Sequence, residues 1–200
     1  EASSLTSIFI PEGVTSIGNF AFDGAKALTS ITIPEGSKLT SIGYYAFKEA
    51  SSLTSIFIPE GVTSIGSLAF YGASSLTSIT IPEGSKLTSI GSLAFYGASS
   101  LTSINIPSGV TSIGDNAFEF ASSLTSVTFK EGSKLTSIGT GVFSRASRLT
   151  SITIPASVTT IGQSAFSRVS RLTSITIPEG SKLTSIGNYA FQEALRLTSI

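Results

Sequence analysis

Cysteine, histidine, methionine and tryptophan are all absent from this chain of 200 residues. The lack of cysteine excludes disulfide bonds. The lack of both cysteine and histidine excludes thiolate and imidazole metal sites and every nucleophile system that uses either residue. The remaining residues form no recognisable set of acid, base and nucleophile. The sequence therefore predicts a protein that is not an enzyme and that has no catalytic residue, cofactor or metal site.

Charge is scarce as well. Only 12% of the residues are charged, against about 25% in ordinary globular proteins. Lys plus Arg and Asp plus Glu number 12 each, so the net charge is zero and does not favour nucleic acid or a membrane surface. The longest unbroken apolar run is four residues, as at 44–47, far short of the roughly 20 that a membrane helix needs. We expect no nucleic-acid partner and no membrane insertion.

The few charges are unevenly distributed. Residues 1–100 contain seven acidic residues and four lysines, a balance of −3, whereas residues 101–200 contain five acidic and eight basic residues, a balance of +3. All five arginines lie in the last third, at Arg145, Arg148, Arg168, Arg171 and Arg196. If the chain forms a rod, these charges favour head-to-tail stacking of copies, which we state as a hypothesis.

What the chain does contain is a repeat. A leucine opens each Leu-Thr-Ser unit at intervals of alternately 23 and 25 residues, so the true period is a pair of 48 residues. Short units read Pro-Glu-Gly-Val, as at 11–14, and long units read Pro-Glu-Gly-Ser-Lys-Leu, as at 34–39. Repeats of this length stack because no single copy can bury its apolar face. We predict one solenoid domain over residues 1–200, with about eight repeats and no cap at either end.

Each unit has three parts. In residues 28–33, Ile31 and Ile33 alternate with Thr32, the pattern of a strand with one buried face. Residues 14–18 indicate a shorter strand that ends at a glycine. Residues 19–25 are too few for a stable helix, and we expect a single helical or 3₁₀ turn there. The fold class predicted is an α/β repeat, with a parallel sheet on one face and short strands and helical turns on the other.

The predicted core repeats with the unit. One phenylalanine per unit should anchor each copy, and a recurrent glycine, as at Gly43 and Gly66, suggests a backbone shape or a close approach that a Cβ would block. In the second unit the expected buried residues are Leu28, Ile31, Ile33, Leu39, Ile42, Ala46, Phe47 and Ala50.

The unit Leu-Thr-Ser-Ile-Thr-Ile-Pro-Glu-Gly-Val-Thr-Ser-Ile-Gly-x-x-Ala-Phe-x-x-Ala-Ser-Ser resembles the BspA-like class of leucine-rich repeats along the whole chain. The resemblance implies a leucine-rich-repeat solenoid, an extracellular or cell-surface location, and adhesion by binding host or matrix proteins. It carries no catalytic residue. One departure is systematic. Where the family often has cysteine three residues after the phenylalanine, this chain has alanine or valine, as at Ala50 and Val169.

The outward face of the main sheet is the candidate binding surface, although its columns of small polar groups are also typical of an ordinary β-sheet surface. One column of this face interrupts its threonines with Phe9 and Phe57, which are candidates for a binding patch. The column contains Phe9, Thr32, Phe57, Thr80, Asn105, Thr128, Thr153 and Thr176. A second threonine column runs through Thr15, Thr40 and their equivalents. The glutamates of the Pro-Glu-Gly turns are one per unit, and we interpret them as solvated turn residues rather than a cation site.

Three functions are compatible with these features. The first is a non-enzymatic protein-binding or adhesion module, which the resemblance implies. The second is a self-assembling filament element or a designed repeat scaffold, which the regularity favours. The third is ice binding through the hydroxyl columns. The expected partner is accordingly another protein or a second copy of this chain.

Overall fold

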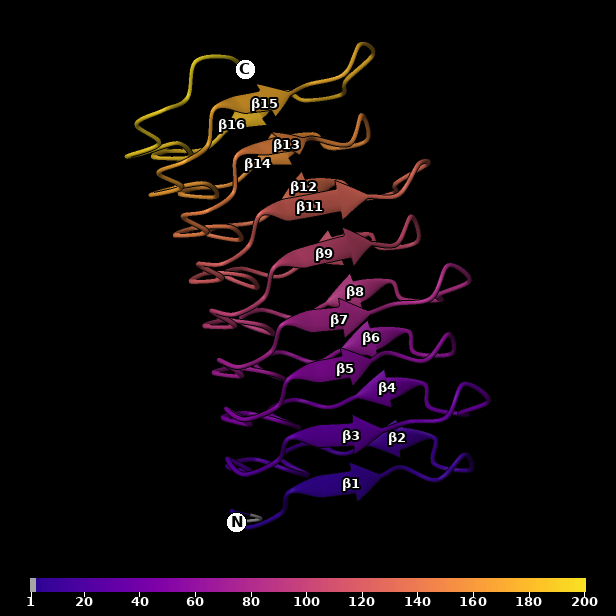
Figure 1. Cartoon of the computed structure of the whole chain (residues 1–200). Coiled ribbons are helices and arrows are strands. Elements are labelled where there is room, and N and C mark those ends of the chain that lie inside the picture. The colour runs from indigo at the N-terminus through magenta and orange to yellow at the C-terminus, as the bar shows by residue number, and fades with distance from the viewer. Residues whose placement is uncertain (1–2) are drawn as a thin grey trace.

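The computed structural model describes residues 3–200. The chain winds through a stack of coils from one end of the stack to the other (Figure 1). Each coil contains one strand of three or four residues, a turn, a strand of two residues, and a second turn that leads to the next coil. We call the longer strands the front strands and the shorter ones the rear strands. The predicted parallel solenoid of about eight coils is confirmed.

The front strands are β1 (Ser7–Phe9), β3 (Ser30–Thr32), β5 (Ser55–Phe57), β7 (Ser78–Thr80), β9 (Ser103–Ile106), β11 (Ser126–Phe129), β13 (Ser151–Thr153) and β15 (Ser174–Thr176). The rear strands are β2 (Ser16–Ile17), β4 (Ser41–Ile42), β6 (Ser64–Ile65), β8 (Ser89–Ile90), β10 (Ser112–Ile113), β12 (Ser137–Ile138), β14 (Thr160–Ile161) and β16 (Ser185–Ile186).

Along the front strands, inward aliphatic side chains alternate with residues that face outward, and the four-residue strand β9 buries two of them, Ile104 and Ile106. In β3, Ile31 is buried while Ser30 and Thr32 are exposed. Paired front strands are parallel and in register, so that Ile8 lies opposite Ile31. Because parallel strands stack at about 4.8 Å, the isoleucines of successive coils pack on one another and form a continuous core.

The front sheet is divided into pairs of strands. Its ladders are β1–β3, β5–β7, β9–β11 and β13–β15, and within residues 3–200 no ladder joins β3 to β5, β7 to β9 or β11 to β13. Each break follows a long unit, and the coil spacing shows the same alternation. The amide of Thr29 lies 2.9 Å from the Thr6 carbonyl, whereas the amide of Thr54, after a long unit, lies 3.4 Å from the Thr29 carbonyl. The 48-residue pair is therefore the hydrogen-bonded unit of the front face.

The third part of the unit is not helical, and the predicted helical or 3₁₀ turn is wrong. No residue within 3–200 is helical. Residues 18–25 form successive β-turns in which Phe20 (φ 57°) and Gly24 (φ 72°) adopt the left-handed conformation. Equivalent positions in other coils place Tyr45 (φ 57°) and Leu68 (φ 55°) in the same region. Non-glycine residues pay about 1 kcal/mol or more for this conformation, so something else stabilises it.

Hydrogen bonds between coils supply that stabilisation. In an α-helix each amide bonds within its own segment, whereas here alternate amides donate to the next coil. The amides of Phe20, Phe22 and Gly24 donate to the carbonyls of Tyr44, Ala46 and Lys48 at 2.9, 2.8 and 2.9 Å. These partners lie one coil away, which is why the local sequence suggested a helix instead.

The core confirms the set of buried residues predicted from the second unit. All eight of those side chains are buried, and Phe47 has no exposed surface. The phenylalanines stack in one column, with ring centroids 5.1 Å apart between Phe22 and Phe47 and 5.2 Å between Phe70 and Phe95. Phe22 and Phe191, in the terminal coils of the stack, are only half-buried.

The recurrent glycine is required by close approach between coils rather than by an unusual φ. A Cβ placed on Gly66 would lie 2.6 Å from the carbonyl carbon of Gly43 in the preceding coil. A Cβ on Gly91 would lie 2.3 Å from the amide nitrogen of Ser67. Real side chains do not tolerate such contacts, so the backbone of this corner stacks directly on itself.

Candidate functional site

The predicted binding column lies on the front strands, where the ladders place its members in adjacent pairs. Phe9 is opposite Thr32, Phe57 opposite Thr80, Asn105 opposite Thr128, and Thr153 opposite Thr176. All except Phe57 are exposed. The fold thus brings the eight residues onto one face, but as four pairs separated by the breaks between ladders.

Phe9 and Phe57 differ although they occupy equivalent positions. The Phe9 side chain is 61% exposed, whereas Phe57 is half-buried and packs against the core. Phe57 also lines a shallow recess of about 270 Å³ together with Glu35, Glu60 and Pro82. Within residues 3–200, β1 contacts only β3, whereas β5 lies between β3 and β7, so the ring of Phe9 is covered on one side less than that of Phe57. The two phenylalanines therefore do not form one equivalent patch.

A larger cleft opens between β11 and β13, and the sequence reasoning missed it. Its volume is about 660 Å³. The partly exposed apolar residues Phe129 and Pro155 line it, and its walls include Thr128 and Thr153 of the predicted column. Lys130 and Glu131 also border the cleft. The cleft therefore opens directly onto the predicted binding column.

Substitutions in a single coil mark where the cleft forms. Phe129 stands where the other long units have isoleucine, and Lys130 stands where they have proline. Val142 replaces the alanine that precedes the core phenylalanine in every other coil. Because Lys130 has an amide that proline lacks, it donates to the Ile106 carbonyl at 3.0 Å and holds β11 against β9. These three departures from the repeat were the signal that could have predicted the cleft.

The backbone hydrogen bonds locate the same opening. The amide of Thr125 donates to the Thr102 carbonyl at 2.9 Å, and that of Thr173 donates to the Thr150 carbonyl at 2.8 Å. Among the described residues, the corresponding bond from Thr150 to Thr125 is absent. The stack is thus interrupted on its front face between β11 and β13.

The hydroxyls of the second threonine column are used inside the protein. Thr40 Oγ1 donates to the Thr15 carbonyl at 2.9 Å, and Thr88 Oγ1 donates to the Thr63 carbonyl at 3.0 Å. A hydroxyl that donates to the backbone cannot donate the same proton to an ice lattice. These threonines therefore stabilise coil stacking.

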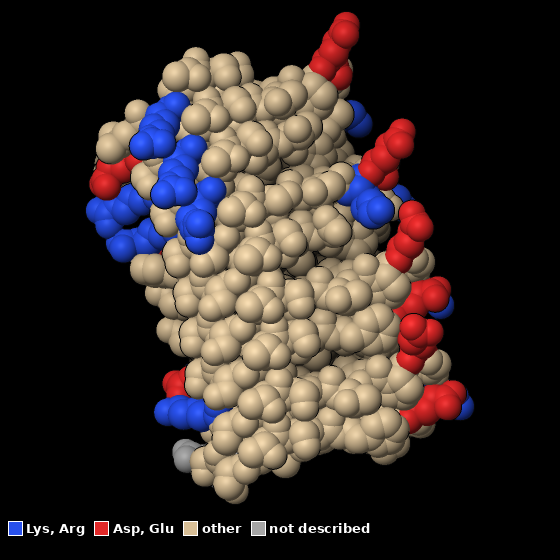
Figure 2. Space-filling model, viewed as in Figure 1, with Lys and Arg blue, Asp and Glu red and all other residues tan. Residues whose placement is uncertain are grey.

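Charged side chains gather on two opposite edges of the stack. Acidic side chains follow one edge, and basic side chains cluster on the other edge toward the C-terminal end (Figure 2). The acidic edge carries the turns between front and rear strands, where Lys130 Nζ lies 3.8 Å from Glu83. Within residues 3–200, no three carboxylates converge on a site that could hold a metal ion.

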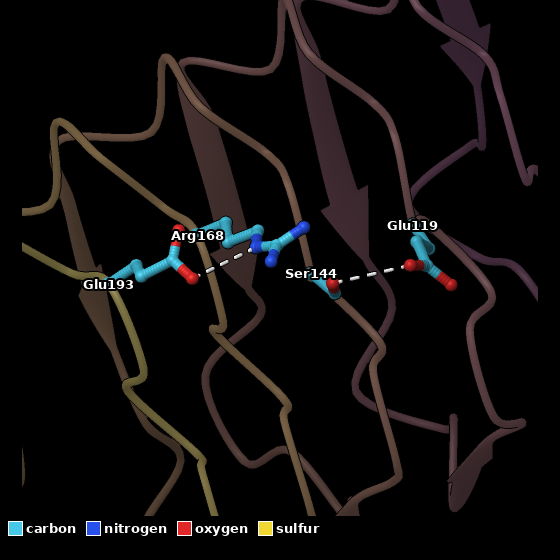
Figure 3. Close-up of polar contacts among 4 residues, drawn as sticks. All are labelled: Glu119, Ser144, Arg168 and Glu193. Atoms are coloured by element: carbon cyan, nitrogen blue, oxygen red, sulfur yellow. Dashed lines mark hydrogen bonds and ion pairs between the residues drawn. The ribbon is translucent and has the colours of Figure 1, made fainter.

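The basic edge is formed by the turns that follow the rear strands. Arg168 Nε donates to Glu193 at 3.2 Å across successive coils, and Ser144 Oγ donates to Glu119 at 3.3 Å (Figure 3). The guanidinium of Arg145 lies over the Phe120 ring, 4.7 Å from its centroid. We call Arg145, Arg148, Arg168, Arg171 and Arg196 together the arginine edge.

An aromatic stack precedes the arginine edge on the same side. Tyr71 and Tyr96 stack face to face with centroids 4.8 Å apart, and Phe120 packs its edge against Tyr96 at 5.2 Å. Partial burial raises the pKa of Tyr96 above its ordinary value of 10.0, with the nearby Glu119 charge adding to the shift. The rings thus cover one another and stiffen this side of the stack.

No helix within the described residues has the length and hydrophobicity to cross a membrane. The parallel coils, the leucine and isoleucine columns and the exposed front face define the class of leucine-rich-repeat solenoids. The pattern of the BspA type Leucine rich repeat region matches residues 1–118 and 88–200 in six copies. The chain belongs to this family.

Solved structures of bacterial proteins are similar along almost the whole chain. A leucine rich cell surface protein from Faecalibacterium prausnitzii is 30% identical with a TM-score of 0.61, and the match covers 98% of this chain and 59% of that protein. A leucine-rich repeat protein from Bacteroides ovatus is 26% identical with a TM-score of 0.68, and the match covers 98% and 74% of the two chains.

The pneumococcal vaccine antigen PcpA is 25% identical with a TM-score of 0.68, covering 97% of this chain and 50% of that protein. The chain thus spans 59% and 50% of the length of two of these relatives. No curated protein sequence is recognisably related to it.

Proposed function

We propose that this chain is a non-enzymatic protein-binding module of an extracellular or cell-surface protein, and that its front face is the binding surface. The observation that carries the proposal is the cleft between β11 and β13, which adds an apolar recess to the exposed column at Thr128 and Thr153. Binding sites combine concave apolar surface with a few polar groups that set orientation. Membership of the family and the cell-surface relative support the location.

The front face suits a protein partner better than a small substrate. Its polar groups are hydroxyls and one asparagine amide, and the cleft adds a single lysine and a single glutamate at its border. Hydroxyls and amides offer adaptable hydrogen bonds, and apolar recesses accept the anchoring side chains of a partner. No group in this set is suited to serve as a nucleophile with its activating base.

Filling the cleft tests the proposal. Binding of the chain to a panel of purified extracellular-matrix proteins would be measured for the wild type and for the double variant Thr128→Arg and Thr153→Arg. The matched control adds the same charge on exposed rear-strand positions, Ser112→Arg and Ser185→Arg. We expect the front-face variant to lose binding and the rear-strand variant to keep it. Equal effects of the two variants, or no binding by the wild type, would contradict the proposal.

Self-assembly is the second candidate, and the uneven charge favours it. Basic side chains cluster toward the C-terminal end of the stack, and acidic side chains predominate in the first half of the chain (Figure 2). Because residues 1–100 carry a net charge of −3 and residues 101–200 a net charge of +3, the opposite halves of successive copies would attract each other head to tail. Size measurements across dilution and salt test this, and a strictly monomeric species throughout would remove the candidate. Thermal hysteresis in cold solution tests ice binding, which the internally bonded threonine hydroxyls do not favour.

A further inference from the structure

Three of the arginines form a straight column on the solenoid. Arg148, Arg171 and Arg196 are separated by 23 and 25 residues, the lengths of one short and one long unit, so they occupy the same position in successive coils. The coils are held in register beside them, because the Arg145 amide donates to the Ser167 carbonyl at 2.8 Å. Since parallel coils stack at about 5 Å, the column carries one guanidinium roughly every 5 Å.

The fold does not require arginine at this position. The five earlier coils place small neutral residues there and stack in the same way: Ala27, Ser52, Ser75, Ser100 and Ser123. Likewise, Arg145 and Arg168 replace residues that include Gly72 and Gly97. The arginines are therefore additions to an unchanged scaffold, confined to three consecutive coils.

Little on the protein neutralises these charges. Arg148, Arg171 and Arg196 are exposed and form no ion pair with any described residue. Among the described residues, the one ion pair on the arginine edge joins Glu193 to Nε of Arg168 at 3.2 Å, while the guanidinium extends toward the coil of Ser144 (Figure 3). The acidic edge is the opposite edge of the stack (Figure 2). Of the five guanidinium groups, only that of Arg168 thus has a carboxylate partner among the described residues.

We propose that the arginine edge binds a linear sulfated polysaccharide lying along the solenoid axis. Guanidinium groups bind the oxygens of sulfate in paired, charge-assisted hydrogen bonds. A row of guanidinium groups at coil spacing matches a ligand that carries anionic groups at short intervals along an extended chain. This role is separate from the front face, because the arginines lie in the turns outside the front strands.

The neighbouring aromatic rings favour a polysaccharide over a single-stranded nucleic acid. Proteins that bind single strands stack bases on open aromatic faces. Here the faces of Tyr71 and Tyr96 cover each other, with an interplanar angle of 1°, and Arg145 covers the Phe120 ring. The arginine edge therefore offers charge and hydrogen bonds without a platform for bases.

Replacing the three column arginines with serine removes their charges and introduces the residue that four earlier coils have at the same position. The variant Arg148→Ser, Arg171→Ser and Arg196→Ser would be compared with the wild type for binding to a size-defined heparin oligosaccharide by titration calorimetry. The control removes three exposed charges from the opposite edge, Lys38→Ser, Lys86→Ser and Lys134→Ser. Circular dichroism and thermal melting would establish that both variants keep the fold.

We expect the arginine variant to bind heparin at least about tenfold more weakly and the lysine variant to bind within about twofold of the wild type. The slope of log K against log salt should become shallower by about 2 in the arginine variant, since each contact to a flexible polyanion contributes about 0.7. Equal losses in the two variants would overturn the proposal. So would equally tight, equally arginine-dependent binding of an oligothymidylate or of anionic lipid vesicles.

Discussion

The ring centroids of Phe118 and Phe143 lie 5.9 Å apart, the widest step in the phenylalanine column. Earlier steps such as Phe95 to Phe118 measure 5.3 Å. Val142 precedes Phe143 and is fully buried where the other coils have alanine. Its two extra methyl groups occupy space between coils, so the stack spreads in the coil that also borders the cleft.

The interrupted backbone ladder at this coil should be visible in amide hydrogen exchange. The Thr150 amide lacks the bond to the Thr125 carbonyl, so it should exchange faster than the amides of Thr125 and Thr173, which donate at 2.9 and 2.8 Å. Exchange followed by NMR under native conditions measures the three side by side. Equal protection of all three would contradict the opening between β11 and β13.

Replacing a phenylalanine of the column with alanine should destabilise the protein more when the ring is more deeply buried. Phe95→Ala removes a ring that is 1% exposed and should lower the free energy of unfolding by about 3–5 kcal/mol. Phe22→Ala removes a half-buried ring from a terminal coil and should cost distinctly less. Urea denaturation followed by circular dichroism compares them. Similar losses would mean that the column does not stack as described.

The glycine at the stacked corner should not tolerate a side chain. Gly91→Ala would place a Cβ 2.3 Å from the Ser67 amide nitrogen, so the coils must separate. We expect a loss of at least about 1–3 kcal/mol in the free energy of unfolding. Gly13→Ala is the control because no atom of the described residues lies within 4 Å of its Cβ position, and it should melt close to the wild type. The prediction fails if the two alanines are equally tolerated.

Substitutions of Phe9 and Phe57 should differ in their effect on stability, although both should weaken partner binding. Phe9→Ser should weaken binding to a matrix-protein partner with little change in melting temperature, because its ring is 61% exposed. Phe57→Ser should also lower the melting temperature, because that ring packs against the core. Unchanged affinity in both variants would clear these residues of a binding role.

Ionisation of Tyr96 should destabilise the protein at high pH. Because burial and Glu119 raise its pKa in the folded state, the unfolded chain ionises first as pH rises through 10. The contribution of Tyr96 is fully present below that pH and is lost as pH rises through the folded-state pKa. Tyr96→Phe should therefore reduce the fall in unfolding free energy between neutral and strongly alkaline pH. An identical pH profile in the variant would show that Tyr96 is not responsible.

Much of the fold could be predicted because the same residue type recurs at the same position of successive repeat units. The spacing of Leu28 and its equivalents established the 48-residue pair, and the alternation at Ile31 and Ile33 indicated the buried face of the front strands. The candidate column from Phe9 to Thr176 was found for the same reason. The turn around Phe20 was mistaken for a helix, because the hydrogen bonds that decide its conformation end on the next coil.

The sequence by itself determined the period, the core residues and the parallel solenoid, since apolar side chains that recur in strict register must be buried between stacked copies. The resemblance of the repeat unit indicated the family. The tertiary structure alone decided how far apart successive coils lie. That distance divides the front sheet into pairs and opens the cleft beside Thr128 and Thr153. The place of a coil in the stack decides that Phe57 is more buried than Phe9. Coil spacing is set by contacts between residues about one repeat apart, and no single repeat contains them.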